Sequence, residues 1–389
     1  MNFGLYFHIP FCVNKCKYCD FLSFKDSDIS LNDKKSYFDA LFTEWDIKSS
    51  LISSNDIVDS IYIGGGTPSV VDYKFIQEII FKIKNKTKVA EDAEITIEVN
   101  PGTITLDKLK AYFSCGINRL SIGVQSTQNR LLKSLGRIHN VNDCESTLLL
   151  AKQAGFTNIS CDLIFGIPKI EDEEGQSFEE FIDDINNVLK WGATHVSAYS
   201  LIIEEDTPLF DLFEQNKAFE INTDIERKMY YSMPEILKKH DMFRYEISNY
   251  GKIDTQSRHN LRYWKCLPYI GLGLGAASYY PTNKEERNSD YIRESNTRNL
   301  KNYINKNFVG ECEIISLNEQ MKEFMMLGFR CATGPDRRSF FNRFNIDYFD
   351  IFKEQLEFLK SKGLISLEDS AKLTEKGYDF ANEVFREFV

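Results

Sequence analysis

The chain has 389 residues, longer than one ordinary domain, so we expect two or three domains. Acidic residues outnumber basic residues by 58 to 47, which excludes an overall positive field that would gather nucleic acid or an anionic membrane surface. No apolar run reaches the roughly 18 residues of a transmembrane helix, and a strand expected near Met1 leaves no room for a signal peptide. Nine cysteines, an odd number, indicate a reducing compartment, so we expect a cytoplasmic protein.

Short β-type runs alternate with amphipathic segments through the first part of the chain. The predicted strands are Phe3–Ile9, Val58–Ile63, Ile95–Val99, Arg119–Val124, Asn158–Phe165 and His195–Leu201. The predicted helices are Lys34–Ser49, Tyr73–Lys86, Leu106–Cys115, Val141–Ala154, Phe178–Trp191 and Asp224–Lys239. Regular alternation of this kind predicts a parallel α/β fold, either doubly wound or a barrel.

Three cysteines lie close together directly after the first predicted strand. Cys12, Cys16 and Cys19 follow the pattern C-x3-C-x2-C, with Tyr18 just before the last of them. Thiolates at this spacing hold iron-sulfur clusters, and a [4Fe-4S] cube normally takes four, so three thiolates leave one iron open to an outside ligand. A structural zinc site is the alternative, because zinc accepts three cysteines and one histidine and His8 lies nearby.

Polar or glycine-rich residues also stand at or near the ends of the next predicted strands. Gly64–Pro68 follows the second strand, Glu98 and Gln125 lie at the ends of the third and fourth, and Asp162 lies in the fifth. Each of them alone is explained by a turn, a cap or an exposed carboxylate. Together they mark the carboxyl ends of successive strands, where a parallel barrel builds its active site.

Side-chain alternation in these strands predicts a polar barrel interior. In the third strand Ile95, Ile97 and Val99 share one face, and Thr96 and Glu98 share the other. Helices cover the outside of a barrel, so the aliphatic face should point outward and the polar face inward. Such an interior suits a polar cofactor better than a packed core.

These residues together resemble the radical S-adenosylmethionine (SAM) superfamily, and within it the coproporphyrinogen III dehydrogenase-like branch. The resemblance covers about the first 200 residues and implies a partial (β/α)6 TIM-type barrel, since eight units at this spacing would exceed the usual ~250 residues. It implies a [4Fe-4S] cluster on Cys12, Cys16 and Cys19, with SAM chelating the open iron. The implied SAM-binding residues are Tyr6, Tyr18, Gly65, Gly66, Thr67, Glu98, Gln125, Arg137 and Asp162, with a further contact between Val196 and Leu201.

A second distinctive cluster lies beyond the predicted barrel. It is a hexad that begins with His259 and Asn260 and ends with Tyr263 and Trp264, and it resembles a signature of the heme chaperones in the same branch. A histidine can ligate heme iron and aromatic rings can cover a porphyrin face, so the resemblance implies heme contacts for these four residues. Without the resemblance, the residues of the hexad indicate a structural role, in which they form a polar part of the core whose groups are hydrogen-bonded within the protein. Ala277 stands where the family often has a histidine.

The rest of the chain predicts a connecting region and a smaller domain. Asn283–Asn307 is polar with little periodicity and reads as a linker or surface excursion. Helices are predicted at Met321–Cys331, Tyr348–Lys362 and Thr374–Phe388, with an extended run at Leu364–Leu367. The resemblance implies a winged-helix-like α+β domain here, and its acidic residues favour covering the barrel or contacting a protein over binding DNA. The expected domains are the radical SAM partial barrel over residues 1–240, the connecting region over 241–310 and the C-terminal domain over 311–389.

Two functions compete on this scaffold. The dehydrogenases of the branch decarboxylate two propionates of coproporphyrinogen III, and their motif has a fourth cysteine two positions after the third. Phe21 occupies that position here, which weakens the enzyme interpretation. The hexad favours a chaperone that binds heme as cargo and delivers it to hemoproteins, with contact to a membrane or respiratory protein. Radical modification of an RNA base is disfavoured by the net charge. Whether SAM is cleaved and whether the chain forms a homodimer stay open.

Overall fold

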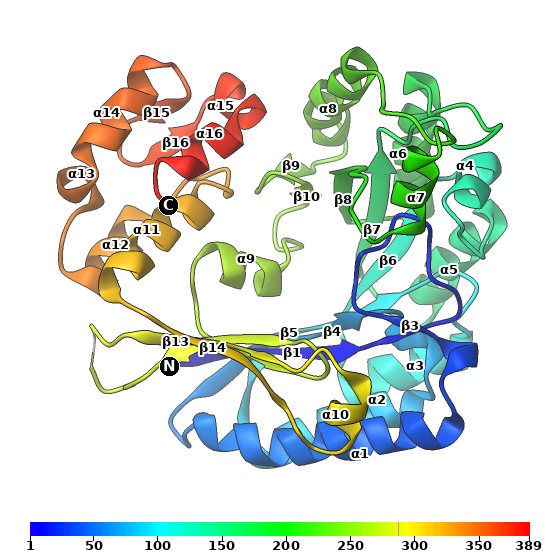
Figure 1. Cartoon of the computed structure of the whole chain (residues 1–389), viewed down its shortest axis with the longest axis horizontal. Coiled ribbons are helices and arrows are strands. Elements are labelled where there is room, and N and C mark those ends of the chain that lie inside the picture. Colours follow the sequence, from blue (N-terminus) through cyan, green and yellow to red (C-terminus); the bar gives the residue numbers. More distant parts are fainter. Residues whose placement is uncertain (287) are drawn as a thin grey trace.

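The computed structural model describes residues 1–286 and 288–389. Within them one sheet of twelve strands runs in the order β14-β13-β12-β11-β1-β4-β5-β6-β7-β8-β10-β9. Six adjacent strands in the middle of this order pair in parallel and form the curved part of the sheet (Figure 1). They are β1 (Asn2–Ile9), β4 (Ile57–Gly65), β5 (Lys88–Val99), β6 (Arg119–Gln125), β7 (Asn158–Phe165) and β8 (His195–Ser200). The predicted six-stranded partial barrel is confirmed.

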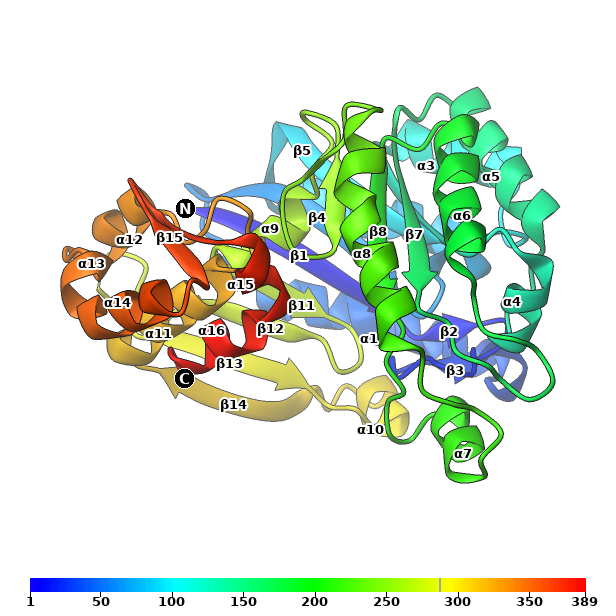
Figure 2. The same ribbon diagram turned by 90° about the horizontal axis from the view of Figure 1, so that it is seen from above.

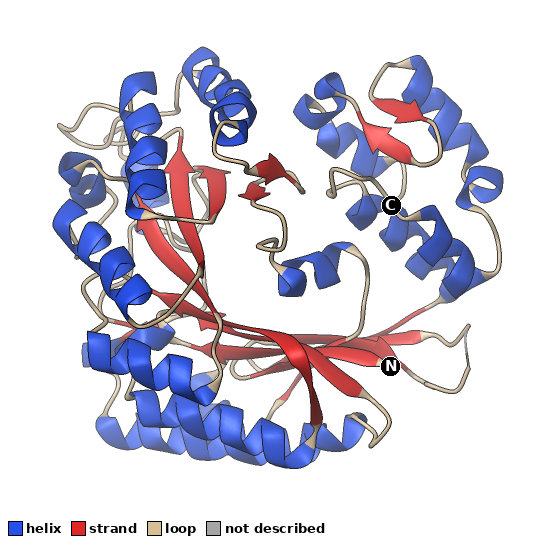
Figure 3. Ribbon diagram, turned by 180° about the vertical axis from the view of Figure 1, so that it is seen from behind, coloured by secondary structure: helices blue, strands red, loops and turns tan. Residues whose placement is uncertain are grey.

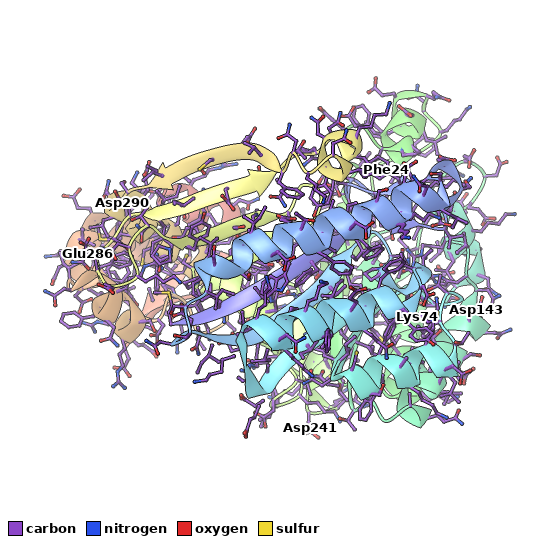
Figure 4. The ribbon with its side chains drawn as sticks, turned by 90° about the horizontal axis from the view of Figure 1, so that it is seen from below. Phe24, Lys74, Asp143, Asp241, Glu286 and Asp290 are labelled. Carbon is purple, nitrogen blue, oxygen red and sulfur yellow. The ribbon has the colours of Figure 1, made fainter. Side chains whose placement is uncertain are left out.

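Each of the six parallel strands is followed by a helix, and these helices cover the outer face of the sheet (Figure 3). They are α1 (Leu31–Lys48), α2 (Tyr73–Lys86), α3 (Leu106–Cys115), α5 (Val141–Gln153), α6 (Phe178–Trp191) and α8 (Thr223–Lys238). Figure 4 shows α1 and α2 side by side on that face. All six begin after a side chain that accepts backbone N–H groups of the first turn: Ser30, Asp72, Thr105, Asn140, Ser177 and Asn222. Such caps satisfy donors that a helix start leaves unpaired.

Alternating side chains give the parallel sheet an apolar outer face and a polar inner face, as the sequence predicts. On β5, Ile97 is buried in a core that also contains Ile79 of α2, while Glu98 lines a cavity on the other side. On β6, Ile122 belongs to the same core and Ser121 lines the same cavity. The interior of the barrel is therefore a polar chamber rather than a packed core.

Beyond the barrel the chain adds strands to both edges of the same sheet. β10 pairs antiparallel with β8, β11 pairs parallel with β1, and the remaining strands continue antiparallel. Their bounds are β9 (Phe243–Arg244), β10 (Asn249–Gly251), β11 (Tyr269–Leu272), β12 (Ala277–Pro281), β13 (Tyr291–Asn296) and β14 (Val309–Ile315). Helices α9 (Arg258–Trp264) and α10 (Leu300–Ile304) interrupt this run. A separate short ladder joins β2 (Phe11–Cys12) and β3 (Phe24–Lys25) around the cysteine loop.

The prediction of a linker or surface excursion over Asn283–Asn307 is wrong, because the range contains α10 and β13, which is a strand of the main sheet. Residue 287 lies outside the described residues. Along β13 only Tyr291 and Asn296 are buried, and the residues between them are half-buried. Arg293 and Glu294 stand in that middle part. A strand whose middle residues are polar and half-buried shows no alternation of apolar and polar residues, and a strand prediction depends on that alternation.

Short elements also differ from the prediction. Helices α4 (Asn129–Ser134) and α7 (Pro208–Glu214) are not predicted, because 6 and 7 residues are too few to show a helical period. Single 3-10 turns occupy Asp26–Asp28, Ser49–Leu51 and Pro68–Val70. Along residues 1–286 and 288–389, no helix combines the length and the apolar character needed to cross a membrane.

The C-terminal segment folds around its own apolar core, with Met325, Phe340 and Leu356 among the buried side chains. Figure 2 shows it at one end of the molecule, beside β12 and β13. Its elements are α11 (Leu317–Gly328), α12 (Arg337–Phe344), α13 (Tyr348–Ile351), α14 (Lys353–Ser361), β15 (Ile365–Leu367), β16 (Ala371–Leu373), α15 (Glu375–Asp379) and α16 (Ala381–Arg386). The antiparallel pair β15–β16 among helices confirms the winged-helix-like prediction. Two predicted helices are each broken in two, at Phe352 and at Phe380, whose backbones leave the helical region.

Candidate functional site

A cavity of about 400 Å³ lies inside the barrel and reaches the carboxyl ends of the strands. Nearly all residues predicted to bind the cluster and SAM line it: Cys12, Cys16, Tyr18, Cys19, Gly65, Gly66, Thr67, Glu98, Gln125, Arg137 and Asp162. Tyr6 is the predicted SAM residue outside this lining, and its hydroxyl lies 2.9 Å from His8 Nδ1. The fold therefore brings the predicted set together from five separate strand ends.

The loop with the three thiols is fixed by its backbone. Lys17 N donates to Leu135 O at 3.0 Å, and Cys19 N donates to Cys16 O at 3.3 Å. All three thiols are free. Burial raises the pKa of Cys12 and raises the pKa of Cys19 to about 11. The Cys12 and Cys19 thiols therefore stay protonated at neutral pH until a metal displaces the proton.

The glycine-rich turn after β4 presses against the cysteine loop. A Cβ atom on Gly66 would lie 2.9 Å from Phe11 O and 3.0 Å from Cys12 Sγ. Gly65 has φ of +113°, a conformation that other residues rarely adopt. Thr67 Oγ1 donates to Cys12 Sγ at 3.5 Å. Glycine is needed here because the backbone approaches the sulfur too closely to leave room for a side chain.

Two half-buried carboxyl groups face the cavity from β5 and β7. Glu98 accepts hydrogen bonds from Tyr62 Oη at 2.8 Å and from Gly65 N at 2.9 Å, and burial raises its pKa to about 7. Ser121 Oγ donates to both oxygens of Asp162 at 3.2 Å, and burial raises the pKa of Asp162 as well. Such groups suit an ammonium or ribose hydroxyls, which would replace the lost hydration.

Arg137 connects the cysteine loop to the ends of β5 and β6. Its Nη1 lies 3.3 Å from Cys16 Sγ, and its Nη2 donates to Asn100 Oδ1 and to Gly123 O at 2.7 Å each. Its Nε is buried without a partner among the described residues. Of the five N–H groups of this guanidinium, the one on Nε lacks an acceptor, which suits a group that receives a carboxylate.

The cavity is also lined by residues that the sequence did not single out, among them Tyr62, Asn100, Arg119, Ser197 and Tyr199. Arg119 is 2% exposed, and in the described part of the chain its Nε has no hydrogen-bond partner. The available signal was the period of two along β6, which puts Arg119 on the same face as Ser121. The SAM contact expected between Val196 and Leu201 falls where Ser197, Tyr199 and Leu201 line the cavity.

The hexad predicted to contact heme lies mostly outside the cavity. Asn260 lines it, whereas His259, Tyr263 and Trp264 do not. His259 is fully buried, with Nδ1 at 3.1 Å from Ser60 Oγ and Nε2 at 2.8 Å from Tyr263 Oη. Burial lowers the pKa of His259 to about 3, so its ring is neutral. Both ring nitrogens are thus engaged inside the protein, and neither is free to meet an iron in this arrangement.

The three thiols fit an iron-sulfur cube better than a single zinc ion. His8, the expected fourth zinc ligand, is engaged at both nitrogens, with Nδ1 near Tyr6 Oη and Nε2 at 2.8 Å from Leu22 O. A cube gives each thiolate its own iron, so it needs the three cysteines and not His8.

Comparison with known proteins identifies the family. The radical SAM superfamily model matches residues 6–182, and the HemN C-terminal domain model matches residues 315–380. The heme chaperone HemW of Bacillus subtilis is 33% identical and that of Escherichia coli 31%, each over 99% of this chain and 98% of the relative. Coproporphyrinogen III oxidase (HemN) from Escherichia coli, a radical SAM enzyme, is similar in structure with a TM-score of 0.80, over 99% of this chain and 89% of its own, at 21% identity. The chain therefore belongs to the HemW family of the radical SAM superfamily.

Proposed function

We propose that this protein is a heme chaperone, which binds heme and delivers it to hemoproteins on a scaffold that carries a [4Fe-4S] cluster and SAM. The observation that carries the proposal is the match to proteins named heme chaperone HemW, which spans the barrel, the hexad and the C-terminal domain. Phe21 supports it further. This residue occupies the position of the dehydrogenases' fourth cysteine, lines the cavity and is 59% exposed.

Cys12, Cys16 and Cys19 are the proposed cluster ligands. The proposed SAM residues are Tyr6, Tyr18, Gly65, Gly66, Thr67, Glu98, Gln125, Arg137 and Asp162. The reduced cluster, when bound, supplies the electron for radical chemistry on SAM. The chain's own part is to bind and orient SAM. The glycines leave room for close backbone approach, Glu98 can accept from the amino group, and the unpaired N–H of Arg137 suits the carboxylate.

Heme is the proposed cargo, and the histidines limit how its iron can be held. Four of the five histidines are buried with both ring nitrogens in polar contacts: His8, His139, His195 and His259. His240 is exposed. A heme ligated by histidine therefore uses His240, or it requires one of the four buried rings to give up a contact inside the protein. Delivery of heme to acceptor hemoproteins, including membrane-associated respiratory proteins, stays a prediction. Formation of a homodimer is a prediction as well.

An anaerobic assay separates the chaperone from a coproporphyrinogen III dehydrogenase on the same fold. Cluster-reconstituted protein with SAM, a strong reductant and coproporphyrinogen III should form no protoporphyrinogen IX, because the position of the fourth cysteine holds Phe21. Chromatography follows the product, and heme titrated in parallel should bind stoichiometrically. HemN assayed under the same conditions is the positive control. Product formed over many turnovers would make this protein a dehydrogenase.

SAM affinity should fall as the pH is lowered through about 7. Burial raises the pKa of Glu98 to about 7, so its carboxylate is ionised above that pH and protonated below it. Only the ionised form accepts strong hydrogen bonds from the amino group of SAM with both of its oxygens. Calorimetric titration with SAM between about pH 6 and 8 measures the effect. Glu98→Gln should bind SAM about tenfold more weakly at pH 8, and its affinity should change less with pH than that of the wild type; the change that remains is that of the SAM amino group itself. A wild-type affinity that is constant over this range would contradict the assignment of Glu98.

A further inference from the structure

Helix α9, which carries the hexad, lies between the barrel and the C-terminal domain (Figures 1 and 3). Ser257 caps its first turn by accepting from Asn260 N. Glu94 of β5 accepts the backbone N–H groups of Arg258 and His259 at 2.9 and 3.0 Å. Because this strand holds the start of the helix through its backbone, the hexad is anchored to the barrel and does not form a surface motif.

The His259 ring holds Tyr62 in place. The two rings stack with their centroids 5.3 Å apart. Ser60 and Tyr263 contact the two imidazole nitrogens at 3.1 and 2.8 Å. Ser60 and Tyr62 are two residues apart on β4 and therefore share its inner face. His259 is thus tied to the strand at Ser60 and covers the next side chain on that face.

Tyr62 in turn holds Glu98. Tyr62 Oη donates to Glu98 Oε1 at 2.8 Å, while Gly65 N donates to Glu98 Oε2 at 2.9 Å. The pair packs over Gly64, where a Cβ atom would lie 2.7 Å from Tyr62 Cε1 and 2.9 Å from Glu98 Oε1. A chain of direct contacts therefore leads from His259 to a carboxyl group that lines the cavity.

We propose that the hexad positions the cofactor cavity: His259 fixes the Tyr62 ring, and Tyr62 fixes the orientation of Glu98 for the amino group of SAM. His259 is then a positioning residue and not a heme ligand. The inference rests on the SAM site proposed above. At the other end of α9 the Arg330 guanidinium lies 4.2 Å from the centroid of the Trp264 ring, so the same helix connects the C-terminal domain to Glu98.

Tyr62→Phe tests the contact to Glu98, because it keeps the ring and its stacking and removes only the hydroxyl. The dissociation constant for SAM should rise about tenfold, the effect of losing one hydrogen bond to a charged group. SAM changes the electron paramagnetic resonance spectrum of the reduced cluster, and in this variant a higher SAM concentration should be needed to produce that change. The matched control is Tyr303→Phe, which removes another buried bond, 2.6 Å from Tyr303 Oη to Glu44. This control should keep wild-type SAM affinity, and an equal loss in both variants would overturn the proposal.

His259→Ala separates positioning from heme ligation. We expect SAM binding to weaken about as much as in Tyr62→Phe, with heme affinity and the Soret spectrum unchanged. The double variant that carries both Tyr62→Phe and His259→Ala should bind SAM no more weakly than the weaker-binding of the two single variants, because both changes act through Glu98. Gly64→Ala should also weaken SAM binding, because the added methyl group would push on Tyr62 and Glu98.

Loss of heme binding in His259→Ala with SAM affinity retained would overturn the proposal and make His259 a ligand. A wild-type protein without SAM binding would refute the cofactor site itself, a failure that is visible before any variant is made.

Discussion

Replacing Cys16 with serine should reduce bound iron from about four atoms per chain to almost none. A cube held by three thiolates has no spare protein ligand, so the loss of one leaves two irons without protein support. Cys16 is also tied to the cavity wall, because Arg137 Nη1 lies 3.3 Å from its Sγ. Iron and acid-labile sulfide, measured on protein purified without oxygen, give the result directly.

Cys312→Ser is the matched control for this experiment. Cys312 is an exposed thiol on β14, outside the cavity lining, so its loss should leave iron and sulfide at wild-type levels. Equal iron loss in both variants would show that the effect is not specific to the cysteine loop. One zinc atom per chain and no sulfide in the wild-type protein would instead support a structural zinc site.

Arg262→Ala should lower the free energy of unfolding by about 3–5 kcal/mol, the cost of breaking a buried ion pair at one partner. Arg262 is 3% exposed and pairs with Asp59 at the start of β4. Its Nη1 also donates to Asn2 O at 3.2 Å and to Pro268 O at 2.8 Å. Removing the side chain therefore leaves a carboxylate and two carbonyl groups without their donor, where α9 meets β1 and β4. Urea unfolding followed by circular dichroism measures the difference.

Arg258→Ala, in the same helix, is the control. Arg258 pairs with Asp92 at 3.1 Å, but both side chains are well exposed, at 43% and 80%. Exposed pairs contribute little because water screens them, so this variant should stay within about 1 kcal/mol of the wild type. A cost for Arg262→Ala as small as that for Arg258→Ala would mean that Arg262 does not anchor α9.

The barrel could be predicted because its signal is local. Each strand and each helix of the parallel part carries its own period of apolar residues, and caps such as Ser30 and Ser177 mark where helices begin. The same reasoning fails at β13, whose middle residues are half-buried and have no apolar period. It also fails at Phe352 and Phe380, where aromatic residues continue the apolar pattern although the backbone leaves the helix.

The cavity could be predicted in part, because parallel strands end at the same edge of a sheet. Cys12, Glu98 and Asp162 stand at or near such ends, so their order along the chain already implied that they meet. Arg119 lies at the start of its strand, and only the depth of the cavity brings it into the lining. The sequence shows Tyr62 only as an aromatic residue in a strand, whereas the structure shows that its hydroxyl donates a hydrogen bond to Glu98.

The sequence by itself determined the alternation of strands and helices, the spacing of the three thiols and the family resemblance, because all three are patterns among neighbouring residues. Only the tertiary structure decided what the hexad contacts. Ser60 and His259 are 199 residues apart along the chain, yet Ser60 Oγ lies 3.1 Å from the imidazole. A histidine that looks suited to iron from its neighbours in sequence becomes a buried, neutral ring when distant side chains engage both of its nitrogens. Burial and hydrogen-bond partners are set by packing and not by the local motif, so the motif alone could not distinguish a ligand from a support.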